Sequence, residues 1–260
     1  SGFDNVAIGT SAMGTGIVTG YFNIALGKIA LEDITSGTDN IALGRLAAGN
    51  LTTGISNIAV GSGSMGLGTV TGNDNISIGN FALEDLTSGI NNIAIGSGSA
   101  ASVTTNRSNI AIGYQSFATS ADDGDKNIAI GYKAMSLGDV AGDNNIGIGG
   151  QTLQDLTSGI NNIAVGPSAA SNLTTGGQNV FIGNSTAGTG IVTGDKNIGF
   201  GTEALAVLTS GAENIAIGSS ALTAAAETVA TFFSVAGLKT FLYPLPDVNF
   251  PFIYIFVGNF

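Results

Sequence analysis

The five-residue pattern Asn-Ile-Ala-Ile-Gly recurs along this chain at a spacing that few folds can accommodate. The segment between Asn and Gly, such as Ile93-Ala94-Ile95, is short, β-branched and bounded by turn residues, and it therefore indicates a strand. A unit of 17 or 18 residues can hold two short strands and two turns, but not a strand, a helix and two loops. The repeat predicts an all-β fold, a parallel β-solenoid of about thirteen coils. The Asn of the motif stands at positions 5, 23, 40, 57, 75, 92, 109, 127, 145, 162, 179, 197 and 214.

Two glycines accompany each motif. One follows the Asn by four positions in every copy, and the other precedes it by three positions in every copy but one, where Asn106 takes its place. Asn is the residue that best tolerates the left-handed conformation after Gly, so this exchange indicates a turn that requires positive φ. A recurring Leu-Thr-Thr-like segment, at Leu51, Leu86 and Leu173, predicts a second strand in each coil. The stacked Asn side chains should form a ladder of amide hydrogen bonds.

The residue at the centre of each strand is small in nearly every copy. Alternation along a strand sends this residue to the opposite face from its two neighbours. If the two Ile positions point inward, the small residues point outward, and a strand so poor in polar outer residues is expected to be covered. We therefore expect a homo-oligomer, a trimer above all, packed along this strand, with a monomer that exposes a flat alanine face as the alternative.

Composition excludes several functions. The chain has no Cys and no His, so the commonest nucleophile–base pairs and zinc sites are not available to it. Seven basic residues against eighteen acidic ones cannot form the basic stripe that nucleic acid requires. We expect no catalytic, cofactor-binding or metal-binding residues, no small-molecule substrate and no enzyme activity. The acidic pair Glu32-Asp33 and its counterparts at Glu84-Asp85 and Asp155 are interpreted as solvated acids, because three or four coils separate them.

The chain divides into two parts. Residues 1–228 carry the repeat, and they contain a longer period of three coils, visible where Ala30–Gly37 returns as Ala82–Gly89. Residues 229–260 break the pattern: they are apolar, rich in aromatics and Pro, and hold only two charges. This segment is interpreted as a C-terminal cap or an assembly element, since the open end of a solenoid exposes a strand edge.

The repeat resembles the head repeats of YadA-like trimeric autotransporter adhesins and related repeats of bacteriophage fibres, on stretches such as 92-NIAIGSGSA-100. The resemblance covers roughly residues 2–222, and it implies a left-handed parallel β-roll in which three chains pack side by side. The coils here are longer than is usual for those heads, and we expect neither a heptad stalk nor a four-strand membrane anchor among residues 223–260.

Three functions follow as expectations. The first is a structural fibre or adhesin-like protein, extracellular on a cell surface or a virion, that attaches to a host or matrix receptor. The second is a filament subunit that polymerises end to end through residues 229–260. The third is an ice-binding solenoid, suggested by an interrupted row of Thr. The departures from the repeat that merit attention are Phe181, Tyr114, Tyr132, Lys133 and the acidic segment 122–125.

Overall fold

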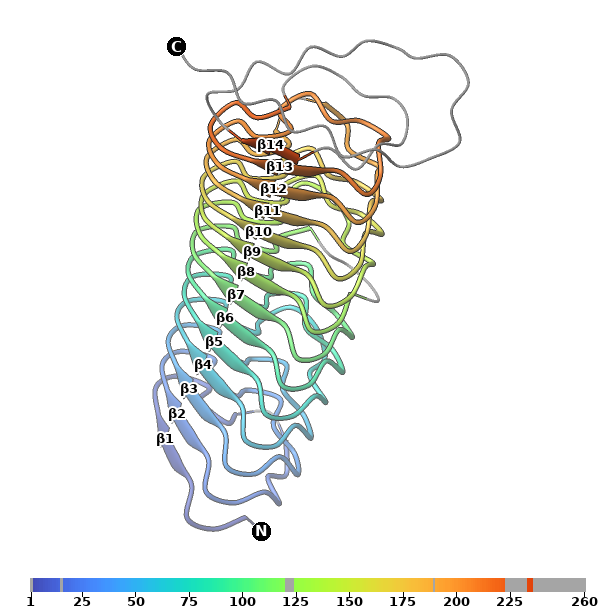
Figure 1. The fold of residues 1–260 in the computed structure, drawn as a ribbon. Helices are drawn as coiled ribbons and strands as arrows, with labels where there is room; N and C mark the ends of the chain where they lie inside the picture. The colour runs from blue at the N-terminus through green and yellow to red at the C-terminus, as the bar shows by residue number, and fades with distance from the viewer. Residues whose placement is uncertain (1, 15, 120–123, 189, 223–232, 236–260) are drawn as a thin grey trace.

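The structure, a computed structural model, describes residues 2–14, 16–119, 124–188, 190–222 and 233–235. The chain winds into a rod in which one short strand per coil stacks on the next, so that a single parallel sheet runs along one side of the molecule (Figure 1). The strands are β1 (Val6–Ile8), β2 (Ile24–Leu26), β3 (Ile41–Leu43), β4 (Ile58–Val60), β5 (Ile76–Ile78), β6 (Ile93–Ile95), β7 (Ile110–Ile112), β8 (Ile128–Ile130), β9 (Ile146–Ile148), β10 (Ile163–Val165), β11 (Val180–Ile182), β12 (Ile198–Phe200), β13 (Ile215–Ile217) and β14 (Phe233–Val235).

The solenoid predicted from the repeat is confirmed. Each strand pairs in parallel with the next in chain order, and the motifs stay in register, as Ile93↔Ile110, Ala94↔Ala111 and Ile95↔Ile112 show. At ~4.8 Å per step, the twelve steps from β1 to β13 span about 58 Å. β14 adds a strand that lies within residues 229–260 and pairs with β13. The boundary at residue 228 and the rest of the 229–260 segment lie outside the described residues.

The Asn ladder is also confirmed. The Nδ2 of Asn162 donates to the Oδ1 of Asn145 at 3.0 Å and to the carbonyl of Gly176 at 2.8 Å. Its own Oδ1 accepts from the backbone N–H and the Nδ2 of Asn179, each at 3.0 Å. The same bonds link Asn5, Asn23 and Asn40 at the N-terminal end of the rod. Because these side chains are buried, each amide has to find partners within the ladder, and this requirement fixes the register of the coils.

The expectation of a positive φ at the glycine three positions before the motif is wrong. Positive φ occurs instead at the glycine that ends the motif, for example 132° at Gly96 and 131° at Gly113. The earlier glycine is required for space: a Cβ on Gly54 would lie 2.5 Å from the carbonyl oxygen of Gly72 in the next coil. Asn106, which carries a Cβ at this position, donates from its Nδ2 to the carbonyl of Gly124 at 3.1 Å.

The predicted second strand is not formed within the described residues. Leu51 and Leu173 each make only an isolated parallel bridge, to Val70 and Val192. The rest of the coil instead turns repeatedly through left-handed residues, such as Leu46 and Ala48 in one coil. Hydrogen bonds between successive coils satisfy the backbone there, for example from Ala48 N to Ser64 O at 2.8 Å.

The orientation expected for the strands is inverted. The central residue points into the coil and is fully buried, as at Ala94, Ala111 and Ala129, while the flanking Ile residues point outward. The interior leaves little space for the central residue, because large buried side chains such as Leu31, Leu83 and Leu153 project into it from the part of the coil that faces the strand. At Gly147 even an added Cβ would come within 3.1 Å of Thr152 Oγ1 and 3.2 Å of Met135 Cε. Small central residues are therefore a demand of the chain's own core, not of a covering partner.

Candidate assembly surface

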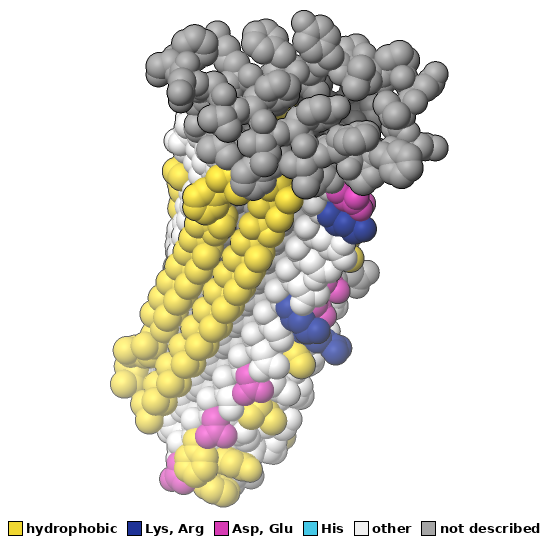
Figure 2. All heavy atoms as spheres, viewed as in Figure 1, with side chains coloured by type: hydrophobic (Ala, Val, Ile, Leu, Met, Phe, Trp, Pro, Cys, Tyr) yellow, Lys and Arg dark blue, Asp and Glu magenta, His cyan; other side chains and the backbone are white. Residues whose placement is uncertain are grey.

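Two parallel columns of branched apolar side chains run along the outer face of the sheet (Figure 2). They come from the first and third residues of the strands β1 to β13, and we call them together the isoleucine face. These side chains are partly exposed, reaching 58% at Ile8, 38% at Ile78 and 53% at Phe200. Stacking within the chain buries the flanks of each side chain and leaves its outer surface in water. Single apolar residues are common on protein surfaces, but this strip is continuous over about 58 Å. Large contiguous apolar surfaces of this kind are typical of interaction sites.

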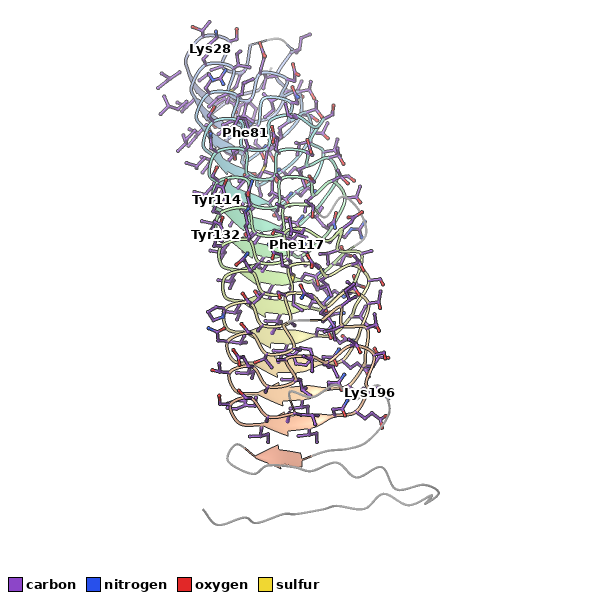
Figure 3. All side chains as sticks on the ribbon, turned by 90° about the horizontal axis from the view of Figure 1, so that it is seen from above. Lys28, Phe81, Tyr114, Phe117, Tyr132 and Lys196 are labelled. Carbon is purple, nitrogen blue, oxygen red and sulfur yellow. The ribbon has the colours of Figure 1, made fainter. Side chains whose placement is uncertain are left out.

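Polar and charged residues border both sides of the isoleucine face. The upstream rim consists of the residue before each motif Asn: Asp4, Phe22, Asp39, Ser56, Asp74, Asn91, Ser108, Lys126, Asn144, Asn161, Gln178, Lys196 and Glu213. The downstream rim consists of the two residues after each motif Gly, and its charged members are Lys28, Arg45, Lys133 and Glu203. Figure 3 shows Lys28, Phe81, Tyr114 and Tyr132 along one edge of the rod and Lys196 at the other. The two rims therefore flank the apolar face on opposite sides.

Two aromatic clusters interrupt the repeat. On the downstream rim, the rings of Tyr114 and Tyr132 stack with centroids 5.6 Å apart and planes at 12°, and Lys133 Nζ lies 5.5 Å from the Tyr132 centroid. In the first two coils, the ring of Tyr21 stacks on Phe3 and meets Phe22 edge-on. Both clusters are ladders between consecutive coils, and they leave the rings at the margins of the isoleucine face.

Phe181 has a structural role. It occupies the central position of β11 and is fully buried. Gly199 follows it in the same column, and a Cβ there would lie 3.2 Å from the Phe181 ring. The large side chain and the neighbouring glycine therefore compensate for each other within one column of the core.

The acidic residues do not converge. Among the described residues, no group of three or more His, Cys, Asp or Glu side chains could hold a metal ion. Asp122 and Asp123 lie outside the described residues, and the carboxylate of Asp125 accepts a hydrogen bond from the Arg107 N–H. Burial, followed by the neighbouring Asp85, raises the pKa of Glu84. These carboxylates form no acid–base pair in the described part of the chain.

The row of Thr considered for ice binding is exposed at Thr53, Thr71, Thr105, Thr175 and Thr193. Ser36, Ser88 and Ala141 interrupt it, and Asp123, a further interruption in the sequence, lies outside the described residues. The residues that precede this row bond within the rod: the hydroxyls of Thr87 and Thr157 donate to backbone carbonyls of the next coil. One shallow, open hollow lies where Gly177 lacks a side chain, between Ile160 and Asp195. Neither feature presents converging polar groups.

The isoleucine face could have been found from the sequence. The outer positions hold branched apolar residues in every coil, and the inner position holds small ones, which is the arrangement of a narrow core behind a broad apolar surface. The expectation of a covered strand was therefore directed at the wrong residues. In the part of the chain that the structure describes, no helix is long and apolar enough to cross a membrane.

Comparison with known proteins gives no independent assignment: no protein-family model matches the chain, and no curated protein matches it significantly.

Proposed function

We propose that this chain is a structural fibre subunit whose copies associate side by side through the isoleucine face. The observation that carries the proposal is the pair of apolar columns from β1 to β13, partly exposed along the whole rod. Two faces pressed together would remove these side chains from water, at roughly 25 cal/mol per Å² of apolar surface. Hydrogen bonds between successive coils make the rod stiff. Stiffness suits a fibre that projects from the surface of a cell or a virion.

The setting and the number of chains rest on the resemblance of the motif to adhesin heads and phage fibre repeats. On that basis we propose a homotrimer, displayed outside a cell or on a virion, that contributes to attachment. A specific receptor would contact the residues that depart from the repeat, including Tyr114 and Tyr132. The repeated positions are the same in every coil and serve the stacking of one coil on the next.

The decisive experiment is the native molar mass by light scattering, with negative-stain images of the same fraction. A trimer has about three times the chain mass of 25.7 kDa and should appear as a short rod. The variant Ile110→Asp with Ile112→Asp places two carboxylates at the centre of the face and should give monomers with an unchanged circular dichroism spectrum.

A matched control carries two equivalent changes elsewhere. Leu67 and Leu137 lie away from the strands and are 64% and 61% exposed, so Leu67→Asp with Leu137→Asp should leave the assembly intact. A wild-type chain that is a stable monomer at micromolar concentration would overturn the proposal. An oligomer that survives the Ile110 and Ile112 changes would show that another surface is used.

A further inference from the structure

The isoleucine face is too uniform to fix its own alignment. Nearly every coil offers the same pair of Ile, Val or Leu side chains, so sliding one copy by a single coil, ~4.8 Å, loses only one coil's share of the contact. The face also reads almost the same in both directions along the rod. If copies associate as proposed above, something other than the apolar columns has to set their direction and register.

The rims lie within reach of such a contact. A three-residue strand is about 10 Å wide, so the columns alone offer roughly 600 Å² per chain over about 58 Å. A stable interface typically takes about 800 Å² from each partner. Copies pressed together by the isoleucine face would therefore extend their contact onto the rims, where the sequence stops repeating.

We propose that the charged rims align the copies parallel and in register, where they form two ion pairs; displacement by one coil leaves a single ion pair, Lys28 with Asp4 or with Asp39. Parallel copies related by rotation about the rod direction bring the upstream rim of one against the downstream rim of the next, at the same coil. In the third coil Asp39 then faces Arg45, and in the twelfth coil Lys196 faces Glu203. In the second coil the Phe22 ring faces Lys28.

The parallel arrangement creates one meeting of like charges, Lys126 with Lys133. Each cation has a group beside it in its own chain that favours positive charge: Asp125 precedes Lys126, and Lys133 lies over the Tyr132 ring. Within its own chain, Lys196 also lies 3.6 Å from Glu213. Arg107, Asp125, Asp143 and Asp195 lie one residue outside the upstream rim, and the three carboxylates each accept a backbone hydrogen bond from the preceding coil.

The antiparallel arrangement is worse. It places upstream rim against upstream rim, with the first coil opposite the thirteenth, so Asp4 faces Glu213. The seventh coil meets itself, which sets the uncharged Ser108 against the Ser108 of the second copy, with Arg107 one residue outside this contact. Its attractive meetings are Lys28 with Glu203 and the Phe22 ring with Lys196, which is one ion pair fewer than in the parallel arrangement. Charge complementarity at the margin of an apolar contact selects the arrangement more than it strengthens it, and this is the role assigned to the rims.

Cross-linking tests the alignment directly, because the chain has no Cys of its own. Ser56 and Ser62 are uncharged members of the two rims in the fourth coil, separated by at most about 20 Å along one chain. A bismaleimide of about 10 Å is close to the spacing of packed sheets, and a link within one chain leaves the mass of a single chain, so only the mass of joined copies counts. Ser56→Cys with Ser62→Cys should join neighbouring copies of the assembled full chain.

Two further pairs report the alternatives. Ser56→Cys with Asn161→Cys joins copies that are antiparallel, and Ser56→Cys with Asn80→Cys joins copies displaced by one coil. Preferential linking by either pair overturns the proposed alignment while leaving lateral assembly in place. A monomeric wild-type chain would instead overturn the assembly itself, so the two failures are distinguishable.

Charge reversal tests the cause. Arg45→Asp should weaken self-association about fivefold or more per contact, and adding Asp39→Arg should restore it, since the pair is then exchanged. Asp39→Arg alone should weaken self-association to the same extent, and Asp74→Arg is its matched control: it makes the same charge change on the same rim, opposite the uncharged Asn80 and Phe81. If Asp74→Arg weakens assembly as much as Asp39→Arg does, or if the exchanged pair fails to recover, the rims do not select the alignment.

Discussion

Truncating one amide of the Asn ladder should destabilise the rod far more than truncating its neighbour in the sequence. In Asn162→Ala, four side-chain hydrogen bonds disappear, two donated by Nδ2 and two accepted by Oδ1. Two of the four partner groups keep another bond: Asn145 Oδ1 still receives the Asn162 N–H, and Asn179 Nδ2 still donates to Gly194. The Gly176 carbonyl and the Asn179 N–H lose these partners.

The magnitude follows from those two groups. A buried polar group left without its partner costs about 1–3 kcal/mol, so we expect the free energy of unfolding to fall by about 4 kcal/mol. Equilibrium unfolding in guanidinium measures the total, and hydrogen exchange at the Asn179 amide reports the local opening. The exchange measurement matters because repeats of a solenoid unfold in segments, with each coil stabilised by its neighbours.

Asn161→Ala is the control. Asn161 is exposed on the upstream rim with φ of 57°, so its replacement costs only the left-handed strain of Ala, about 1–2 kcal/mol. If Asn162→Ala costs no more than Asn161→Ala, the ladder does not hold the coils together and the reasoning fails.

The isosteric change Asn162→Asp sharpens the test. A carboxylate cannot donate to Asn145 Oδ1 or to the Gly176 carbonyl, whereas a protonated carboxyl can donate to one of them. Burial and acceptor neighbours should therefore raise the pKa of the new carboxyl in the folded state. The folded variant then takes up its proton more readily than the unfolded chain, so its stability should rise as the pH is lowered through that pKa. A variant whose stability relative to wild type does not change with pH would contradict this account.

Three further predictions concern single side chains. Ala111→Leu should lower the free energy of unfolding by about 2–3 kcal/mol, because the interior has no room for it, whereas Ile112→Leu on the outer face should change it by less than about 1 kcal/mol; thermal or guanidinium unfolding compares the two. Gly54→Ala should cost at least about 3 kcal/mol or prevent folding, since its Cβ would lie 2.5 Å from a carbonyl oxygen of the next coil, and circular dichroism with unfolding curves would show this. Wild type should lose a little stability as the pH rises through the raised pKa of Glu84, because a carboxyl whose pKa is higher in the folded state favours folding only while it is protonated. Glu84→Gln should remove this loss, and the difference between the pH–stability curves of the two proteins measures it. Glu84→Asp, which retains a carboxyl beside Asp85, is the comparison.

The sequence predicts the period, the strand and the ladder for one reason: each is imposed by stacking and therefore repeats in every coil. Asn127 and Asn145 align because each amide needs the next, and β8 and β9 align with them. The direction of the strand faces is different. Alternation shows that Ile110 and Ala111 point to opposite sides, but when both kinds of residue are apolar it does not show which side is the core. That choice depends on the width of the coil, which the distant Leu residues of the opposite wall determine.

The glycine before each motif illustrates a second limit. Sequence pattern cannot distinguish a glycine needed for positive φ from one needed for close approach, since both exclude a Cβ. Here Asn106 favoured the first interpretation, whereas the contact of Gly54 with the carbonyl of Gly72 shows the second. The distinction rests on the separation between neighbouring coils, a property of the assembled rod and not of any one repeat.

The inverted strand also changes what the repeated Ile residues imply. Had they formed the core, their uniformity would need no further explanation, because every coil must fill the same interior. On the outside, stacking along the rod still favours branched side chains, but Thr stacks at the same spacing and keeps its hydroxyl in water. The chain does use Thr in another column, where Thr87 and Thr157 bond to the next coil, yet places no Thr at the outer positions of β1 to β13. Intrachain stacking therefore accounts for the shape of these side chains but not for their lack of polar atoms, and removal from water by another copy accounts for both.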